Sequence, residues 1–315
     1  MPMTGELRMP AARRVPVLSL RDFTHGSAAA RLAFQAALFS GLTDYGFIVL
    51  REHGVATTLL EAAYELAETF FALPLEEKRA TSGRRAGYTD FGIEHARYHL
   101  VPDLKEFYSV TRDGLPGGDD NRWPVRPAGL QRVFNELYTA LGETGRLLLQ
   151  ALAPSLQLPA DWFDAKLRHG DSLLRAIHYP PVSADMDPQA VRSAAHEDIN
   201  LLTLLVAARG SGLQLLDRDG VWLPVDSGPQ ELIVDSGDML QRLSNGVIPS
   251  TTHRVVNPEG PNVSRYSMPF FLHPESEMVL DPLPQCVPAG TTPRYPPCTA
   301  GEYLEERLRE IGLKT

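Results

Sequence analysis

The sequence predicts an α+β protein with a core of antiparallel sheet. Apolar residues recur at helical spacing in the first half of the chain, whereas beyond about residue 170 short apolar runs alternate with Gly, Pro, Asp and Asn. Many short strands at close spacing are typical of a sandwich or barrel. No stretch of linker composition separates the two halves, so residues 15–315 are expected to form a single unit.

The first elements of this unit follow a short N-terminal segment. Residues 1–14 are polar and contain proline, and we expect them to be flexible. Residues 15–18 indicate a short edge strand, where proline is tolerated. An Ala-rich segment at about 28–42 is expected to be an amphipathic helix, and the apolar run at 46–50 has the length of a buried strand.

Two longer helices complete a mainly helical layer that extends from residue 15 to residue 170. In the first, apolar residues recur at intervals of three and four, and Pro74 ends the helix. These apolar residues are Leu59, Leu60, Ala63, Leu66, Ala67, Phe70 and Phe71. The second helix begins near Pro127 and ends before Pro154. Between them, residues 80–104 have no steady period and predict a long loop, and loops of this length are usually functional or disordered.

Residues 171–281 are expected to be the strand-rich core. The candidate strands are the apolar runs at 172–179, 201–208, 212–216, 221–225, 231–235, 238–243, 253–257, 265–273 and 278–281. Asn245-Gly246 is a strong hairpin-turn signal, and Gly237-Asp238 suits a tight turn. Residues 282–315 are expected to form a Pro-rich surface loop followed by a C-terminal helix at about 299–311.

Composition argues against several classes of function. The chain carries 30 Lys and Arg residues against 39 Asp and Glu residues, a formal net charge of -9, and it has no Lys/Arg-rich run. Nucleic-acid binding needs clustered cations, so no nucleic-acid partner is expected. No segment has the apolar length of a secretory signal or of a membrane span, so no membrane partner is expected either.

The two cysteines, Cys286 and Cys298, both lie in the Pro-rich stretch near the C-terminus. One disulfide between them is geometrically possible, but a disulfide framework is not. A reducing compartment fits better with so few cysteines, and we expect a cytoplasmic protein. The sequence predicts neither whether the cysteines pair nor which oligomeric state the protein adopts.

Three His-x-(Asp/Glu) patterns are candidates for part of a metal site. His196-Glu197-Asp198 stands before an apolar run, and in an extended chain residues two apart point to the same face. One face then offers an imidazole and a carboxylate together. The other two patterns begin at His169 and His273, and both look like turn chemistry at the end of a helix or a strand.

A further histidine, His253, starts another predicted strand. Two neutral imidazoles and one carboxylate that leave coordination positions open suit a non-haem Fe(II) centre. His196, Asp198 and His253 are therefore the candidate metal ligands. The alternative is that these histidines are ordinary half-buried polar residues of their strands.

Arg265 and Ser267 share one face of the apolar run 265–273. A buried guanidinium without a partner is costly, and its planar fork suits a carboxylate. No acidic residue nearby in the sequence is an obvious partner. An anionic ligand inside the barrel, with the Ser267 hydroxyl as a second donor, would satisfy Arg265. The alternative is that Arg265 reaches solvent or a distant Asp.

In their order and spacing, these residues resemble the isopenicillin N synthase-like branch of the 2-oxoglutarate/Fe(II)-dependent dioxygenases. The resemblance is dense over residues 172–273 and looser in the N-terminal part. The dense part comprises Tyr179-Pro180-Pro181, His196-x-Asp198, Gly212-Leu213-Gln214, Trp222, Gly237-Asp238, Ser244-Asn245-Gly246, Ser250-Thr251-x-His253-Arg254-Val255 and Arg265-x-Ser267. The looser part comprises Val15-Pro16-Val17, Gly46-Phe47 and Phe71-x-Leu73-Pro74-x-Glu76-x-Lys78.

The resemblance implies a double-stranded β-helix (jelly-roll) core flanked by helices. The Fe(II) ligands that it implies are His196, Asp198 and His253. The residues that it implies for binding 2-oxoglutarate are Arg265, Ser267 and Tyr179. Ile177 stands where members of the family often have asparagine, and Glu197 is expected to point away from the iron because of strand alternation.

The implied reaction consumes O2 and 2-oxoglutarate and oxidises a C–H bond of a small-molecule substrate, by hydroxylation, desaturation or ring closure. Two residues are candidates for contact with that substrate. Arg175 would meet a substrate carboxylate or, alternatively, make a structural salt bridge. Tyr88 would belong to a lid over the site or, alternatively, anchor its loop to the core.

Other interpretations stay open. In an oxidase of the isopenicillin N synthase type, which needs no 2-oxoglutarate, Arg265 and Ser267 would bind a different carboxylate. A non-catalytic metal-bound barrel would bind or sense a small acid without turnover. A zinc hydrolase would also suit an open three-ligand site, but it would leave Arg265 and Ser267 unexplained.

Overall fold

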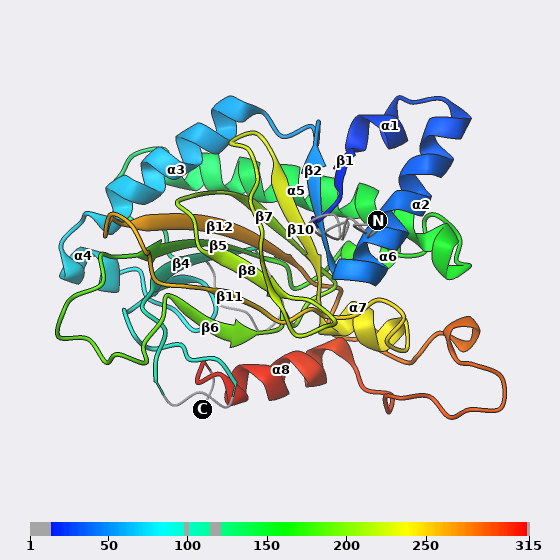
Figure 1. Cartoon of the computed structure of the whole chain (residues 1–315). Helices are drawn as coiled ribbons and strands as arrows, with labels where there is room; N and C mark the ends of the chain where they lie inside the picture. The colour runs from blue at the N-terminus through cyan, green and yellow to red at the C-terminus, as the bar shows by residue number, and fades with distance from the viewer. Residues whose placement is uncertain (1–13, 98–100, 114–120, 314–315) are drawn as a thin grey trace, which may run out of the picture.

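The computed structural model describes residues 14–97, 101–113 and 121–313. Its described strands form two sheets that face each other, and helices lie along the outer side of the larger sheet (Figure 1). Apart from Arg14, the segment 1–14 that was expected to be flexible lies outside the described residues.

The larger sheet combines strands from both halves of the chain. They are β1 (Val17–Ser19), β2 (Phe47–Arg51), β3 (Gly87–Thr89), β4 (Glu106–Thr111), β5 (Leu173–Tyr179), β7 (Leu202–Arg209), β10 (Leu232–Ser236) and β12 (Arg265–Leu272). Their spatial order is β1-β2-β10-β7-β12-β5-β4-β3. As described, neighbours in this sheet are antiparallel except for β1 and β2.

The smaller sheet faces the larger one. Its strands are β6 (Ser193–His196), β8 (Leu213–Leu216), β9 (Trp222–Pro224) and β11 (His253–Val255), in the order β6-β11-β8-β9. All of these neighbours are antiparallel. Two such sheets with flanking helices confirm the predicted α+β class with a jelly-roll core.

Most of the described helices lie along the larger sheet and its edges. The described helices are α1 (Leu20–Thr24), α2 (Ala28–Tyr45), α3 (Thr57–Phe71), α4 (Leu75–Arg79), α5 (Leu130–Leu152), α6 (Asp164–Leu167), α7 (Asp238–Leu243) and α8 (Ala300–Glu310), with 3-10 turns at Ala153–Leu156 and Pro284–Cys286. Helix α5 packs against β4, β5, β7 and β12, whereas α8 lies on the other side of the molecule, below β6 in Figure 1. None of the described helices combines the length and hydropathy needed to cross a bilayer.

A glycine lets α5 approach the sheet closely. A Cβ atom at Gly145 would lie only 2.8 Å from Cδ2 of Leu272 on β12. Two turns away along the helix, the ring of Tyr138 meets the ring of Phe270 edge-on, with centroids 5.1 Å apart. Each large apolar side chain that this contact buries contributes about 1.5–3 kcal/mol.

The neighbouring strands β5 and β12 show two-residue alternation with both faces covered. Ala176, Met268, Phe270 and Leu272 belong to the core on the helical side. The intervening residues face the space between the sheets: Leu173, Arg175, Ile177 and Tyr179 on β5, and Arg265, Ser267, Pro269 and Phe271 on β12. His273, directly after β12, continues this inward face.

Apolar side chains from both sheets fill part of the space between them. This inner cluster comprises Phe47, Leu213, Leu215, Val225, Ile233 and Val255. The space that it leaves is a cavity of about 1340 Å³. The inward residues of β5 and β12 line this cavity together with the candidate metal ligands His196, Asp198 and His253.

One candidate strand of the core was predicted wrongly. The run 238–243 was expected to be a strand but is helix α7. The prediction failed because a run of six residues is too short for its period to distinguish helix from strand. Asn245 and Gly246 do have the left-handed φ values of a tight turn, 52° and 81°. They end α7 rather than joining two strands, since the Gly246 N–H donates to the Gln241 carbonyl at 2.8 Å. The run 278–281 contributes only a single bridge, between Val279 and Thr299.

Two strands of the larger sheet, like β6 of the smaller sheet, have no counterpart among the predicted elements. Strand β3 lies within the predicted loop 80–104, and β4 follows that loop. Every residue of β4 is buried, so its sequence carries no alternation to reveal it. With β1 and β2, which match the predicted strands at 15–18 and 46–50, they join the expected helical layer 15–170 to the larger sheet.

Candidate active site

Two histidines and an aspartate meet on the smaller sheet. His196 ends β6 and His253 begins β11, and the two are direct partners in the antiparallel ladder. Their imidazole rings therefore lie side by side, with centroids 4.3 Å apart. Asp198 follows two residues after His196, and its carbonyl accepts a 2.7 Å hydrogen bond from the N–H of Asp238, the first residue of α7.

These three side chains are close enough to share one cation. Oδ1 of Asp198 lies 3.8 Å from Nε2 of His196 and 3.8 Å from Nε2 of His253. One ligand atom from each residue lies within 4.8 Å of the others. Two imidazole nitrogens and one carboxylate oxygen are the donor set of non-haem Fe(II) sites with open positions. The structure thus brings together the three residues that the sequence predicted as ligands.

Backbone carbonyls orient both imidazoles. Nδ1 of His196 lies 2.7 Å from the Ala194 carbonyl oxygen, and Nδ1 of His253 lies 3.1 Å from that of Thr251. A carbonyl only accepts, so we assign the ring proton to Nδ1 in each case. The Nε2 lone pairs then point to the space that the three residues share, as metal binding requires.

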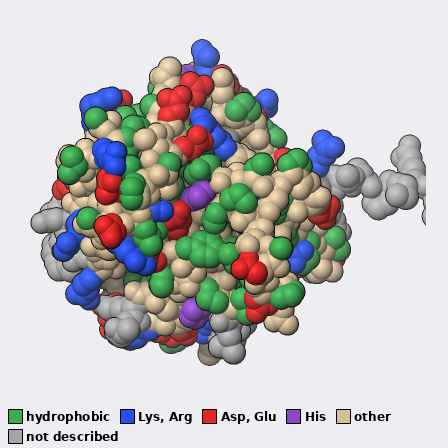
Figure 2. Space-filling view, turned by 90° about the vertical axis from the view of Figure 1, so that its left-hand side faces the viewer, with side chains coloured by type: hydrophobic (Ala, Val, Ile, Leu, Met, Phe, Trp, Pro, Cys, Tyr) green, Lys and Arg blue, Asp and Glu red, His purple; other side chains and the backbone are tan. Residues whose placement is uncertain are grey.

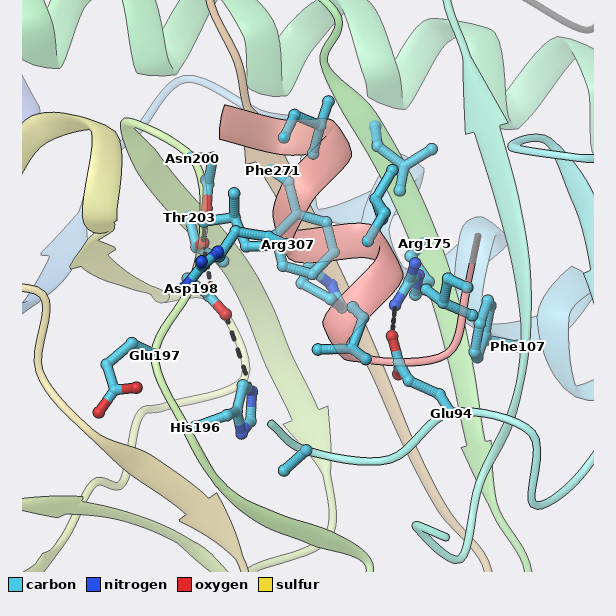
Figure 3. A pocket seen from close by; sticks show the side chains of 18 of the residues that line it. Glu94, Phe107, Arg175, His196, Glu197, Asp198, Asn200, Thr203, Phe271 and Arg307 are labelled. Carbon is cyan, nitrogen blue, oxygen red and sulfur yellow. Dashed lines mark hydrogen bonds and ion pairs between the residues drawn. The ribbon is translucent and has the colours of Figure 1, made fainter. Parts of the chain in front are cut away.

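Asp198 is held by a chain of hydrogen bonds. The Thr203 hydroxyl donates to Oδ2 of Asp198, and the Asn200 side-chain amide donates to Thr203 at 3.1 Å (Figure 3). Oδ1 is therefore the oxygen left for a metal. Glu197 points away from the His196–Asp198 pair in Figure 3 and accepts a hydrogen bond from Thr252, as strand alternation predicts.

Burial sets the charges of this group. Burial and the neighbouring His196 lower the pKa of His253 to about 4, so the imidazole is neutral at physiological pH and able to bind a metal. Asp235 is buried beside Asp198, and burial and the negative charge of Asp198 raise the pKa of Asp235 well above its usual range. Within this buried pair, the neutral carboxyl form is therefore favoured at Asp235.

Arg265 lines the same cavity, and no described residue gives it a partner of opposite charge. The residue is 2% exposed, and its Nε and Nη1 have no hydrogen-bond partner among the described residues. Its guanidinium lies 4.9 Å from the ring of Tyr179, its ladder partner on β5, and the buried Ser267 follows on the same face. Gly210 makes room for the arginine stem, since a Cβ there would lie 3.1 Å from Cγ of Arg265. A buried cation of this kind requires an anion.

A second guanidinium reinforces this positive region. Arg192 is 3% exposed and donates from Nη2 to the Val263 carbonyl at 2.6 Å, two residues before Arg265. Burial and the charge of Arg265 lower the pKa of Arg192. The sequence pattern gave no signal for Arg192, because its role depends on a contact with a segment 71 residues away.

The two residues predicted to contact substrate occupy different places. Arg175 lines the cavity, but its Nη1 lies 3.0 Å from Oε1 of Glu94, and its guanidinium stacks 4.0 Å from the ring centre of Phe107 (Figure 3). The structural salt bridge that was weighed for it is therefore present. Tyr88 is 2% exposed, does not line the cavity, and donates to the carboxylate of Glu106. It anchors β3 to β4.

A buried ionic network extends from Arg175 to the metal site. Nζ of Lys105 lies 2.6 Å from Glu94 and 2.8 Å from Asp103. Asp103 in turn accepts a 2.9 Å hydrogen bond from the backbone N–H of Ala194, in the strand that carries His196. Burial alone would raise the pKa of Glu94, but the charges of Lys105 and Arg175 outweigh it and hold the pKa at about 2.

Two segments that are far apart in the sequence, the loop 80–104 and α8, cover the cavity. Glu94, Ala96 and Arg97 come from the predicted loop 80–104, and Leu304 and Leu308 come from α8. An ion pair of 2.9 Å between Arg97 and Glu310 connects the loop to α8. The loop, whose length predicted a functional or disordered segment, thus lies over the cavity.

Comparison with known proteins places this arrangement in a family. The profile of the 2OG-Fe(II) oxygenase superfamily matches residues 170–274. A second profile, the N-terminal region of a non-haem dioxygenase in morphine synthesis, matches residues 15–127. The 2-oxoglutarate-Fe(II) type oxidoreductase hxnY of Emericella nidulans is 32% identical over 94% of this chain and 89% of its own. The chain belongs to the 2OG-Fe(II) oxygenase superfamily.

Solved structures agree with this assignment. A 2OG-Fe(II) oxygenase family protein from Caulobacter crescentus is 41% identical, with a TM-score of 0.83 over 94% of this chain and 98% of its own. A Neurospora crassa protein solved with alpha-KG (2-oxoglutarate) and thymine is 28% identical, with a TM-score of 0.86 over 94% of this chain and 96% of its own. The predicted resemblance is confirmed. This oxygenase is an oxidoreductase of the 2-oxoglutarate-dependent dioxygenase type, whose cofactors are Fe(II), 2-oxoglutarate and O2.

The sequence pattern missed several polar residues of the oxygenase cavity. Thr203, Glu94 and Lys105 each act through a partner in another element, which no local pattern reveals. His273 did have a signal. It lies eight residues after Arg265, and residues an even number apart on a strand share a face. The sequence suggested that His273 belongs to a turn. In the structure it directly follows β12, and its side chain continues the face of β12 that lines the cavity.

Proposed function

We propose that His196, Asp198 and His253 bind the Fe(II) of this oxygenase. Support comes from the three ligand atoms that converge within 4.8 Å and from the carbonyl partners that turn both Nε2 atoms to the same point. Thr203 keeps the second oxygen of Asp198 occupied. The donor set of this chain therefore fits the metal of its family.

We propose further that Arg265, with Ser267 and Tyr179, binds the distal carboxylate of 2-oxoglutarate. One observation carries this proposal: Arg265 is buried without a described carboxylate partner in the cavity that contains the three metal-ligand candidates. A dicarboxylate between the two sites would supply the missing anion. Fe(II), 2-oxoglutarate and O2 then supply the oxidation of a substrate C–H bond, while 2-oxoglutarate leaves as succinate and CO2.

Matched aspartate variants test the metal site. Asp198→Asn removes the anionic ligand, so we expect Fe(II) binding under anaerobic conditions to fall by at least about 100-fold. Asp235→Asn replaces a carboxyl group whose neutral form is favoured by burial, and we expect it to keep most Fe(II) binding. Equal Fe(II) content in the wild type and Asp198→Asn, measured by metal analysis, contradicts the assignment.

Oxygen uptake with and without 2-oxoglutarate separates the alternative functions. We expect substrate-stimulated uptake that requires 2-oxoglutarate and releases succinate. Uptake that needs only the substrate indicates an oxidase of the isopenicillin N synthase type. Binding of Fe(II) and acid with no succinate indicates a non-catalytic binding barrel, and zinc instead of iron in anaerobically purified protein indicates a hydrolase.

We infer that the substrate is a small molecule rather than a nucleic acid or a membrane surface. The Neurospora crassa neighbour was solved with thymine, which supports a small ligand. On the face shown in Figure 2, acidic and basic side chains are interspersed rather than forming a basic stripe, and the chain has a formal charge of -9.

Cys286 and Cys298 are both free thiols, which supports a reducing, cytoplasmic location.

A further inference from the structure

The wall of the cavity formed by β5 and β12 has a polar group at each end. At one end, Arg265 lies opposite Tyr179. Towards the opposite end, Phe271 lies opposite Leu173. At the other end the alternation continues to His273, whose neighbour across the ladder is the segment that starts at Asp171. The metal site lies along this wall, since Thr203, which holds Asp198, is the ladder partner of Phe271.

Among the described residues, His273 has a buried side-chain nitrogen without a hydrogen-bond partner. The residue is 7% exposed and lines the cavity, and its Nδ1 has no hydrogen-bond partner among the described residues. Its backbone is fixed, because its N–H donates to Ser172 Oγ at 3.1 Å and its carbonyl accepts from the same hydroxyl at 3.3 Å. A buried polar atom that lacks a partner is uncommon and calls for an explanation.

The ring of His273 is uncharged at physiological pH. Burial and the nearby charge of Arg85 lower the pKa of His273 to about 3. A neutral imidazole both donates and accepts hydrogen bonds, and it adds no charge to attract an anion. Its natural partner in a buried site is therefore an uncharged polar group.

The cations in this part of the cavity are already paired. Arg85 lies 3.5 Å from Asp171, Arg175 lies 3.0 Å from Glu94, and Lys105 contacts both Glu94 and Asp103. On α8, Arg307 lies 2.6 Å from Glu306 and 3.0 Å from Glu310. A substrate carboxylate would find these guanidinium and ammonium groups neutralised, and burying it there would leave it without a counter-ion.

We propose that His273 is a specificity-determining residue of this oxygenase and that it hydrogen-bonds the polar head of an uncharged, ring-containing substrate. The ring of Phe271, two residues before His273 on the same face of β12, lines the cavity and forms the apolar surface next to this head. The inference rests on the proposed function, since it places the substrate in the same cavity as the metal ligands and Arg265.

Matched pairs of ligands test this proposal. The probes are aromatic carboxamides and their carboxylates: 4-methylbenzamide with 4-methylbenzoate, and indole-3-carboxamide with indole-3-carboxylate. Each is titrated calorimetrically into the anaerobic protein loaded with Fe(II) and 2-oxoglutarate. We expect the amide of a pair to bind at least about tenfold more tightly than the acid, because only the acid leaves a buried charge unpaired. Tighter or equal binding of the acids, or no binding of either amide, overturns the assignment.

Variants then assign the effect to the imidazole. His273→Ala is expected to weaken amide binding about tenfold, and His273→Asn, which keeps a polar group near the position of Nδ1, to restore most of it. His169→Ala, at an exposed histidine, is the matched control. Unchanged amide affinity in His273→Ala overturns the proposal. If the wild-type protein does not bind 2-oxoglutarate, the proposed function is refuted instead. The failure of the substrate proposal can therefore be distinguished from the failure of the proposed function.

Discussion

Arg265 shows how one side chain can reveal a binding site. Its guanidinium is buried, stacked near Tyr179 and without a described counter-ion. We expect Arg265→Ala to weaken 2-oxoglutarate binding about 100-fold, since the lost contact is a charged, two-point hydrogen bond. Arg265→Lys is expected to recover only part of the affinity, because an ammonium cannot form the planar fork. Anaerobic calorimetry measures both variants.

The same measurement includes its control. Arg192→Lys keeps a positive charge next to Arg265 and removes only the fork that donates to the Val263 carbonyl. We expect it to lower 2-oxoglutarate affinity by less than Arg265→Lys does. An Arg265→Ala protein that binds 2-oxoglutarate as tightly as the wild type would contradict the role of this residue.

His273 also makes the stability of the fold depend on pH. Its pKa falls from an ordinary value of 6.5 to about 3 in the folded protein. Between these values the unfolded chain binds a proton that the folded protein does not, so the free energy of unfolding decreases as pH falls through this window. From pH 7 to pH 5 the loss from this residue is about 2 kcal/mol.

Urea denaturation at the two pH values measures this loss. His273→Asn cannot be protonated there, so we expect its unfolding free energy to decrease by about 2 kcal/mol less than that of the wild type. Glu94 does not obscure the comparison. Its pKa is about 2 in the folded protein and ordinarily 4.5, and both values lie below the pH range tested. The same pH dependence in both proteins would show that His273 is protonated in the folded state.

At the scale of elements, one ionic network fixes the covering loop to the sheet. Glu94 of the loop pairs with Arg175 of β5 and with Lys105, which precedes β4. We expect Glu94→Gln to lower the free energy of unfolding by about 3 kcal/mol, because two buried cations lose their shared anion. Urea denaturation measures the change, and Glu259→Gln, at an exposed glutamate, is the matched control. A loss no larger than that of the control would mean that the network contributes little.

The period of an element decided which parts of the site the sequence could predict. His196 with Asp198, and Arg265 with Ser267, are two residues apart on extended chain, so their shared faces follow from local geometry. The Arg175–Glu94 pair joins residues 81 positions apart, and its loop has no period. Local geometry therefore predicted these two pairs and left both alternatives open for Arg175. The roles of Arg265, Ser267 and Tyr179 toward 2-oxoglutarate came from the family resemblance.

The whole molecule was predictable as a class but not in every element. Short buried runs such as β4 and α7 carry too few residues to show whether their period is two or 3.6. Their identity is decided by packing: β4 by β5 beside it, and α7 by the hydrogen bond from Asp238 to Asp198. The general order of helices first and strands later was sufficient for the α+β class, because that order depends on composition over many residues.

The larger sheet predicts how the molecule unfolds. Strand β2, from the N-terminal part, lies between β1 and β10, and β4 pairs with β5. We infer that residues 15–315 fold as one unit, and we expect a single cooperative transition. In a variant that retains only Trp222, on the smaller sheet, tryptophan fluorescence and the circular dichroism of the helices should report the same urea midpoint. Two separate midpoints would show independent domains.

The two-residue alternation of β5 and β12 has a consequence for diversification. Side chains that pack on α5 occupy one set of positions, and those that face the cavity occupy the other. Exchanges at Leu173 or Phe271 therefore alter what the enzyme accepts without disturbing its scaffold, and they leave the Arg265 end untouched. Evolution or protein engineering can therefore change the substrate through these positions, while the residues at the Arg265 end stay the same.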